Sequence, residues 1–157
     1  MYLCFFDKNL NPAAWKKSMY FTGVRNSTWF KYTSGNFPQS HSDSDDITHP
    51  LFVLSVEKGG PVACPGSTKN WSDREDRRFI LEGTLTDCGK RIRRTTYLVE
   101  ENSFSMPRGQ AFVMDFTKEG HPSGLDLLCL GIVREKDIRQ GRWYVEKTKA
   151  DTSAKRR

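Results

Sequence analysis

Residues 51–65 read LFVLSVEKGGPVACP, and this stretch decides the fold. Its first six residues are an apolar run of strand length, bounded by Pro50 and by Gly59-Gly60. A second run, residues 61–65, follows after a turn at residues 57–60. The pattern therefore predicts a buried central strand and a second strand, joined as a β-hairpin.

Other segments have the β-branched and aromatic composition that favours strands. These segments are residues 27–32, 79–81, 90–99 and 125–133. The last is expected to lead through Gly131 into a helix at residues 135–139, and residues 12–17 predict a second short helix. The chain is therefore predicted to be mostly β with minor α.

The length of 157 residues predicts one domain that buries its own core. Residues 1–40 form a basic, aromatic N-terminal arm of that domain, residues 48–145 carry the predicted sheet, and residues 146–157 are expected to be a basic flexible tail. Residues 34–48 are polar and predict a loop. The net charge of +6 favours an anionic partner, although such a charge can also serve solubility alone.

Several functional classes lack their sequence signals. The chain has no apolar run of about 20 residues that could cross a bilayer, no GxxxxGK[ST] or GxGxxG loop, and no HExxH or GxSxG motif. Its four cysteines form no C-x-x-C pair, so no metal site and no cofactor are predicted. With no secretory signal in the sequence, we expect a cytoplasmic protein whose cysteines are reduced and buried.

The predicted hairpin brings polar residues together at one of its ends. The first strand is entered through Thr48-His49-Pro50, and the second is left through PGSTK at residues 65–69. In an antiparallel pair with its turn at residues 57–60, His49 and Ser67-Thr68 share one end. An imidazole beside hydroxyls suits proton transfer at a phosphate, or phosphate docking. The same residues are also common in turns, so a purely structural role remains an alternative.

A basic segment follows the hairpin. Its arginines match phosphate oxygens through their planar guanidinium groups, and aromatic rings such as Trp71 offer surfaces on which bases can stack. Single-stranded nucleic acid uses this combination of cations and rings, although a solvated sheet face is the alternative. The residues predicted to bind nucleic acid are Lys69, Arg91, Arg93, Arg94 and Tyr97.

Residues 49–55, together with residues 60–69, resemble the two-strand signature of PemK/MazF-like toxins of toxin–antitoxin systems. In that family an Arg-Pro precedes an apolar strand ending in Ser, and a second strand runs into Pro-x-[ST]-[ST]. Residues 95–100 are similar to a later strand that ends in an acidic residue, and the resemblance covers residues 48–138. Two features depart from the pattern: His49 stands in place of the family arginine, and the N-terminal arm lacks the usual Gly-Asp opening.

The resemblance implies an SH3-like barrel with short appended helices, a homodimer, and an antitoxin protein as partner. It also implies metal-independent cleavage of single-stranded RNA. The predicted roles are proton transfer by His49, phosphate binding by Ser67 and Thr68, and orientation of the base by Glu100, while Arg91 and Arg93 offset developing charge. The alternatives are a nucleic-acid-binding module without catalysis, and a protein–protein adaptor that uses the aromatic arm.

Overall fold

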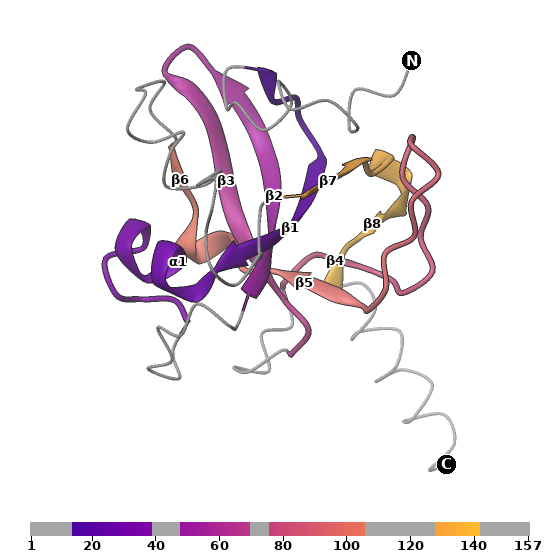
Figure 1. Cartoon of the computed structure of the whole chain (residues 1–157). Coiled ribbons are helices and arrows are strands. Elements are labelled where there is room, and N and C mark those ends of the chain that lie inside the picture. Colours follow the sequence, from indigo (N-terminus) through magenta and orange to yellow (C-terminus); the bar gives the residue numbers. More distant parts are fainter. Residues whose placement is uncertain (1–13, 39–47, 70–75, 106–127, 142–157) are drawn as a thin grey trace, which may run out of the picture.

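The computed structural model describes residues 14–38, 48–69, 76–105 and 128–141 (Figure 1). Its strands are β1 (Met19–Arg25), β2 (Thr48–Glu57), β3 (Gly60–Ser67), β4 (Phe79–Ile80), β5 (Thr96–Leu98), β6 (Phe104–Ser105), β7 (Leu128–Ile132) and β8 (Ile138–Arg139). One α-helix, α1 (Asn26–Tyr32), and two short 3₁₀ helices, η4 (Glu100–Asn102) and η5 (Glu135–Asp137), complete the described elements. The first part of the arm, most of the acidic loop, Trp71 and the predicted tail lie outside these residues.

The described strands form one antiparallel sheet in the order β7-β1-β2-β3-β5-β4-β8, and β6 pairs with β3. Figure 1 shows this sheet curling into a half-barrel, with α1 at one end of the long β2–β3 hairpin. The predicted fold class, mostly β with minor α, is therefore confirmed. None of the described helices is long and apolar enough to cross a membrane.

The β2–β3 hairpin agrees with the prediction from residues 51–65. Its register runs from Glu57↔Gly60 beside the turn to Leu51↔Pro65 near the open end. Both strands extend further than predicted, because β2 already begins at Thr48 and β3 continues to Ser67. The hairpin therefore carries the polar residues at its open end as parts of the sheet.

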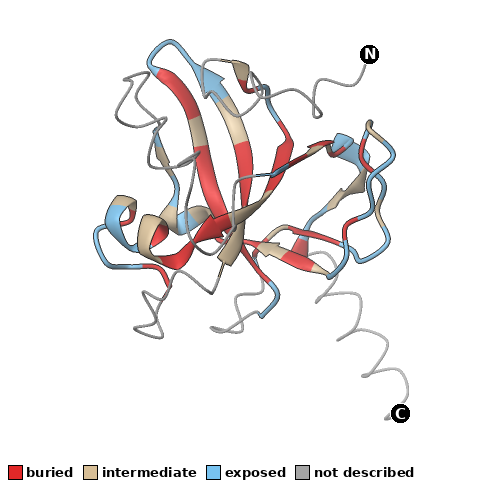
Figure 2. Cartoon of the chain, viewed as in Figure 1, coloured by how far each residue is buried: buried red, intermediate tan, exposed pale blue. Residues whose placement is uncertain are grey.

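Each face of the sheet supports its own apolar cluster, because successive strand residues point to opposite sides. Phe21, Leu51 and Val53 lie in the cluster that also contains Trp29 of α1. Tyr20 and Phe52 lie in the second cluster, with Cys64, Ile80, Ile92, Leu98 and Val133. Figure 2 shows that buried residues concentrate in the three central strands β1, β2 and β3.

The N-terminal arm contributes more to the fold than predicted. β1 lies between β7 and β2 in the sheet, and its Phe21 is fully buried. The prediction of a strand at residues 27–32 is wrong, because these residues lie in α1. Helical periodicity buries Trp29 and leaves Phe30 and Lys31 exposed, and Thr33 Oγ1 donates to the Trp29 carbonyl at 2.7 Å at the helix end.

The basic segment at residues 90–99 forms a shorter strand than predicted, since only Thr96–Leu98 pair as β5. The preceding residues are held by backbone bonds, with Ile92 N donating to the Thr84 carbonyl at 2.8 Å and an isolated bridge between Leu85 and Arg91. The strand predicted at residues 125–133 is present in its described part as β7. The helix predicted after it is instead the 3₁₀ turn η5 followed by β8.

A turn at residues 86–89 covers the outer edge of β7. Asp87 exchanges two bonds with Ile132: its backbone N donates to the Ile132 carbonyl at 3.0 Å, and its Oδ1 accepts from Ile132 N at 2.7 Å. Thr86 Oγ1 donates to the Leu130 carbonyl at 2.5 Å. These bonds satisfy backbone groups that an edge strand would otherwise leave unpaired.

The cysteines divide into two kinds. Cys64 and Cys129 are free and buried, as predicted, and burial raises the pKa of Cys129 to about 11. Cys88 is disulfide-bonded. The expectation that all cysteines are reduced is therefore wrong for Cys88, which is half-buried in the turn beside β7 and packs against the first core cluster.

Candidate functional site

The strand ends at the open end of the β2–β3 hairpin define the candidate site, which we call the strand-end rim. β1 ends there at Arg25, which pairs with Thr48 at the start of β2, and β3 ends there at Ser67. The strands pack closely at Gly66 in this rim, because a Cβ added to Gly66 would lie 2.5 Å from Thr96 Cγ2 and 3.3 Å from Pro50 Cβ. The register of the hairpin therefore brings His49 and the Ser67-Thr68 segment to the same end of the β2–β3 pair.

The His49 ring is held from two sides. Its Nδ1 lies 2.6 Å from Asn26 Oδ1, and Phe37 packs edge-on against it with ring centroids 4.8 Å apart. Because an amide oxygen only accepts hydrogen bonds, Nδ1 carries the proton and Nε2 of the neutral ring keeps its lone pair. Burial lowers the pKa of His49 below its ordinary value of 6.5, since the protein interior disfavours the charged ring. The neutral ring can therefore act as a base at Nε2.

Asn26 was not among the predicted site residues. It is 1% exposed at the start of α1, and Trp29 of the same helix donates its Nε1 to the His49 carbonyl at 3.2 Å. The helix thus positions both the ring and the backbone of His49. No spacing rule connects residue 26 with residue 49, so the sequence carried no signal for this pair.

The hydroxyls of the rim have different environments. Ser67 is 2% exposed, and its Oγ accepts a hydrogen bond from the backbone N of Lys69 at 3.1 Å. This bond closes a local turn, which is the structural role considered for the segment. Thr68 and Lys69 are exposed next to it. Of the two predicted hydroxyls, Thr68 is therefore the one that a ligand can reach directly.

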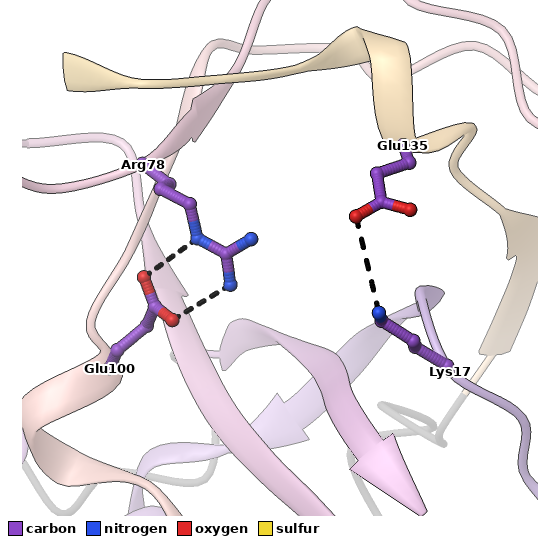
Figure 3. A network of polar contacts seen from close by, with 4 residues as sticks. All are labelled: Lys17, Arg78, Glu100 and Glu135. Carbon is purple, nitrogen blue, oxygen red and sulfur yellow. Dashed lines mark hydrogen bonds and ion pairs between the residues drawn. The ribbon is translucent and has the colours of Figure 1, made fainter.

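Glu100 lies on η4, where Arg78 binds it through both carboxylate oxygens (Figure 3). The two distances are 3.0 Å from Arg78 Nε and 2.8 Å from Nη2, and this pairing raises the pKa of Arg78. Neighbouring Glu101 accepts from Arg77 Nη2 at 2.6 Å. The described contacts of Glu100 are thus with an arginine, whereas His49 Nδ1 is oriented by Asn26.

The predicted nucleic-acid-binding residues occupy two regions. Tyr97 pairs with Ser67 in the β3–β5 register, so it lies at the rim, where its half-buried ring faces Phe79 at 5.9 Å. The three arginines precede β5 and are exposed, with Arg91 and Arg93 on either side of the buried Ile92. The exposed arginines therefore precede the rim residue Tyr97 by three to six positions in the sequence.

No family model, curated protein or solved structure matches this chain. The described residues also contain no group of three or more His, Cys, Asp or Glu side chains placed to bind a metal ion. The function has to be inferred from the residues of the strand-end rim themselves.

Proposed function

We propose that this protein is a metal-independent endoribonuclease of PemK/MazF type that cleaves single-stranded RNA at the strand-end rim. The observation that carries the proposal is the position of His49, whose Nδ1 lies 2.6 Å from Asn26 Oδ1, at the same end of the hairpin as Ser67-Thr68. The resemblance of residues 49–69 to the toxin signature supports it. On this proposal the protein acts as a homodimer, and an antitoxin protein restrains it.

The proposed reaction is an internal transesterification. His49 Nε2 accepts the proton of a ribose 2′-hydroxyl, and the 2′-oxygen then attacks the adjacent phosphorus. The bond from phosphorus to the 5′-oxygen breaks, and that oxygen takes up a proton from solvent, which leaves a cyclic phosphate and a 5′-hydroxyl. The imidazolium returns its proton to solvent, so the ring regains its neutral form.

The other predicted residues would bind charge around this step. Thr68 and the backbone amides of its turn would contact a phosphate oxygen, and Arg91 and Arg93 would offset the charge that develops on the phosphate. Glu100 would act on His49 only indirectly, because both of its oxygens are bonded to Arg78. Its proposed role is therefore to stabilise η4 beside β3.

The test is incubation of the purified full-length protein with end-labelled single-stranded RNA in the presence of a chelator. The wild type is expected to yield a product ending in a cyclic phosphate. His49→Gln is expected to lower the rate by about 10²–10⁴-fold, which is the typical effect of losing a general base. Ser55→Ala is the matched control, because Ser55 bonds Glu57 near the opposite end of β2 and should leave the rate unchanged.

Two outcomes would contradict the proposal. Undiminished cleavage by a folded His49→Gln variant would exclude His49 as the proton carrier. RNA binding without any cleavage by the wild type would favour the second candidate function, a nucleic-acid-binding module. The bonds that occupy Ser67 Oγ and Glu100 favour this second candidate, because they engage two of the four predicted catalytic groups.

A further inference from the structure

Arg25 is a buried arginine with two side-chain nitrogens that form no hydrogen bond to any residue that the structure describes. Its side chain is 4% exposed, and its Nε and Nη2 atoms are sealed from solvent without forming a hydrogen bond. A guanidinium group has five N–H donors and stays protonated at any physiological pH. Burying this charge without a counter-charge is unfavourable, so such a group in a folded protein indicates a missing anionic partner.

Other buried or half-buried arginines of this sheet differ from Arg25. Arg77 is 8% exposed, and although its Nε is also buried without a hydrogen bond, its Nη2 bonds Glu101 at 2.6 Å. Arg78 bonds both oxygens of Glu100. Among the residues that the structure describes, no carboxylate forms an ion pair with Arg25. Arg77 and Arg78 are thus each bonded to a carboxylate, whereas Arg25 is bonded to none of the described carboxylates.

Arg25 lies at the strand-end rim. It is the last residue of β1, it pairs with Thr48, and the preceding residue Val24 pairs with His49. Because neighbouring residues of a strand point to opposite faces, Arg25 lies on the face opposite to His49. A nucleic-acid chain that crosses the rim with one phosphate at His49 can therefore place another phosphate at Arg25.

We propose that Arg25 is a binding site for a phosphate group of the RNA, distinct from the phosphate that reacts at His49. This inference rests on the proposed function for the identity of the ligand. The guanidinium fork matches two phosphate oxygens, and a bound phosphate supplies the acceptors and the negative charge that Arg25 lacks. Only 4% of Arg25 is exposed, so contact of a phosphate with Nε and Nη2 requires the atoms that cover them to move.

The experiment compares thermal unfolding of the full chain with and without phosphate ligands. One arm uses inorganic phosphate against chloride at equal ionic strength. The other uses an oligonucleotide with 2′-O-methyl riboses, which cannot be cleaved because the attacking hydroxyl is absent. At a ligand concentration of 100 times Kd, the folded state is expected to gain about 100-fold in its equilibrium over the unfolded chain.

The variants are Arg25→Met and, as matched control, Arg77→Met. Arg25→Met is expected to unfold at a higher temperature than wild type without ligand, because it removes an unpaired buried charge, and to lose most of the ligand response. Arg77→Met should unfold at a lower temperature, because it leaves Glu101 without its arginine, and should keep the response. Arg25→Lys should keep part of the ligand response, since the positive charge remains but the planar guanidinium group is lost.

Destabilisation or misfolding of Arg25→Met would overturn the inference, because it would show that Arg25 has a structural partner. The inference would also be overturned if the oligonucleotide raised the unfolding temperature of Arg25→Met as much as that of the wild type. If inorganic phosphate stabilises the wild type and the oligonucleotide does not, the ligand of Arg25 is a free anion and not RNA. If the predicted responses are obtained but the wild type cleaves no RNA, the proposed cleavage fails while Arg25 remains a phosphate site.

Discussion

The proton state of His49 controls the proposed reaction, because only the neutral ring can accept a proton at Nε2. Burial lowers the pKa of this ring below 6.5, so the ring is neutral over most of the neutral range. We expect the cleavage rate to rise as pH increases through this lowered pKa and to stay level above it. A rate measured from about pH 4.5 to 8 should therefore show its acidic limb below pH 6.5.

Asn26 provides a way to move that limb. In Asn26→Asp, a carboxylate would replace the amide oxygen 2.6 Å from Nδ1 and favour the imidazolium, which raises the pKa of His49. We expect the limb to shift to higher pH, so that the rate falls near pH 6 and changes little near pH 8. Asn26→Ala should lower the rate at all pH values without this shift. An unmoved profile in the aspartate variant would show that Asn26 does not set the state of His49.

At the level of the secondary-structure elements, the junction between β7 and the turn at residues 86–89 depends on Gly131. This glycine has φ +113°, and a Cβ there would lie 2.5 Å from Asp87 Oδ1 and 2.8 Å from Thr86 Oγ1. A side chain would therefore meet both an unfavourable backbone conformation and the two groups that cover the β7 edge. Gly131 is the position in β7 where the fold requires glycine.

Gly131→Ala is expected to lower the free energy of unfolding by about 2 kcal/mol or more, from backbone strain and steric overlap. Urea-induced unfolding measures this change. Gly59→Ala is the matched control, because no atom lies within 4 Å of the added Cβ and the backbone there is not left-handed. It should change stability by less than about 0.5 kcal/mol. Equal effects of the two substitutions would mean that the turn does not cover β7 as described.

For the whole molecule, the net charge of +6 predicts RNA binding that weakens as salt rises, because each neutralised phosphate releases counterions. The exposed arginines before β5 should supply part of this effect. Replacing Arg91, Arg93 and Arg94 together by Ala is expected to lower affinity for all RNA sequences alike. It should also reduce the slope of log K against log salt by up to about 2, since each phosphate contact with a single strand contributes about 0.7. Fluorescence anisotropy across a salt series measures both quantities.

The control for this variant removes three positive charges elsewhere. It replaces Lys17, Lys58 and Lys136 by Ala, all of which are exposed. An equal loss of affinity in the two triple variants would show that net charge, rather than the surface before β5, determines binding. Unchanged melting temperatures in both are expected, because exposed side chains contribute little to stability.

The sequence by itself determined the β2–β3 hairpin. It also determined that His49 and Ser67-Thr68 lie at the same end of this hairpin. The signals for these features are local: an apolar run, a Gly-Gly turn and a second run lie next to one another in residues 51–65. Antiparallel pairing then follows from connectivity alone. The same locality made β4 and the described part of β7 predictable, because both have composition typical of strands.

Only the tertiary structure decided which groups contact the site residues. Asn26 and His49 are 23 positions apart, and Arg78 and Glu100 are 22 apart, so no periodicity relates either pair. Residues 27–32 form a helix because burial of Trp29 against the sheet outweighs their strand-like composition. That Nε and Nη2 of Arg25 form no hydrogen bond within the described residues is likewise a property of the packed sheet. Side-chain partners depend on distances in space, which the order of residues along the chain does not specify.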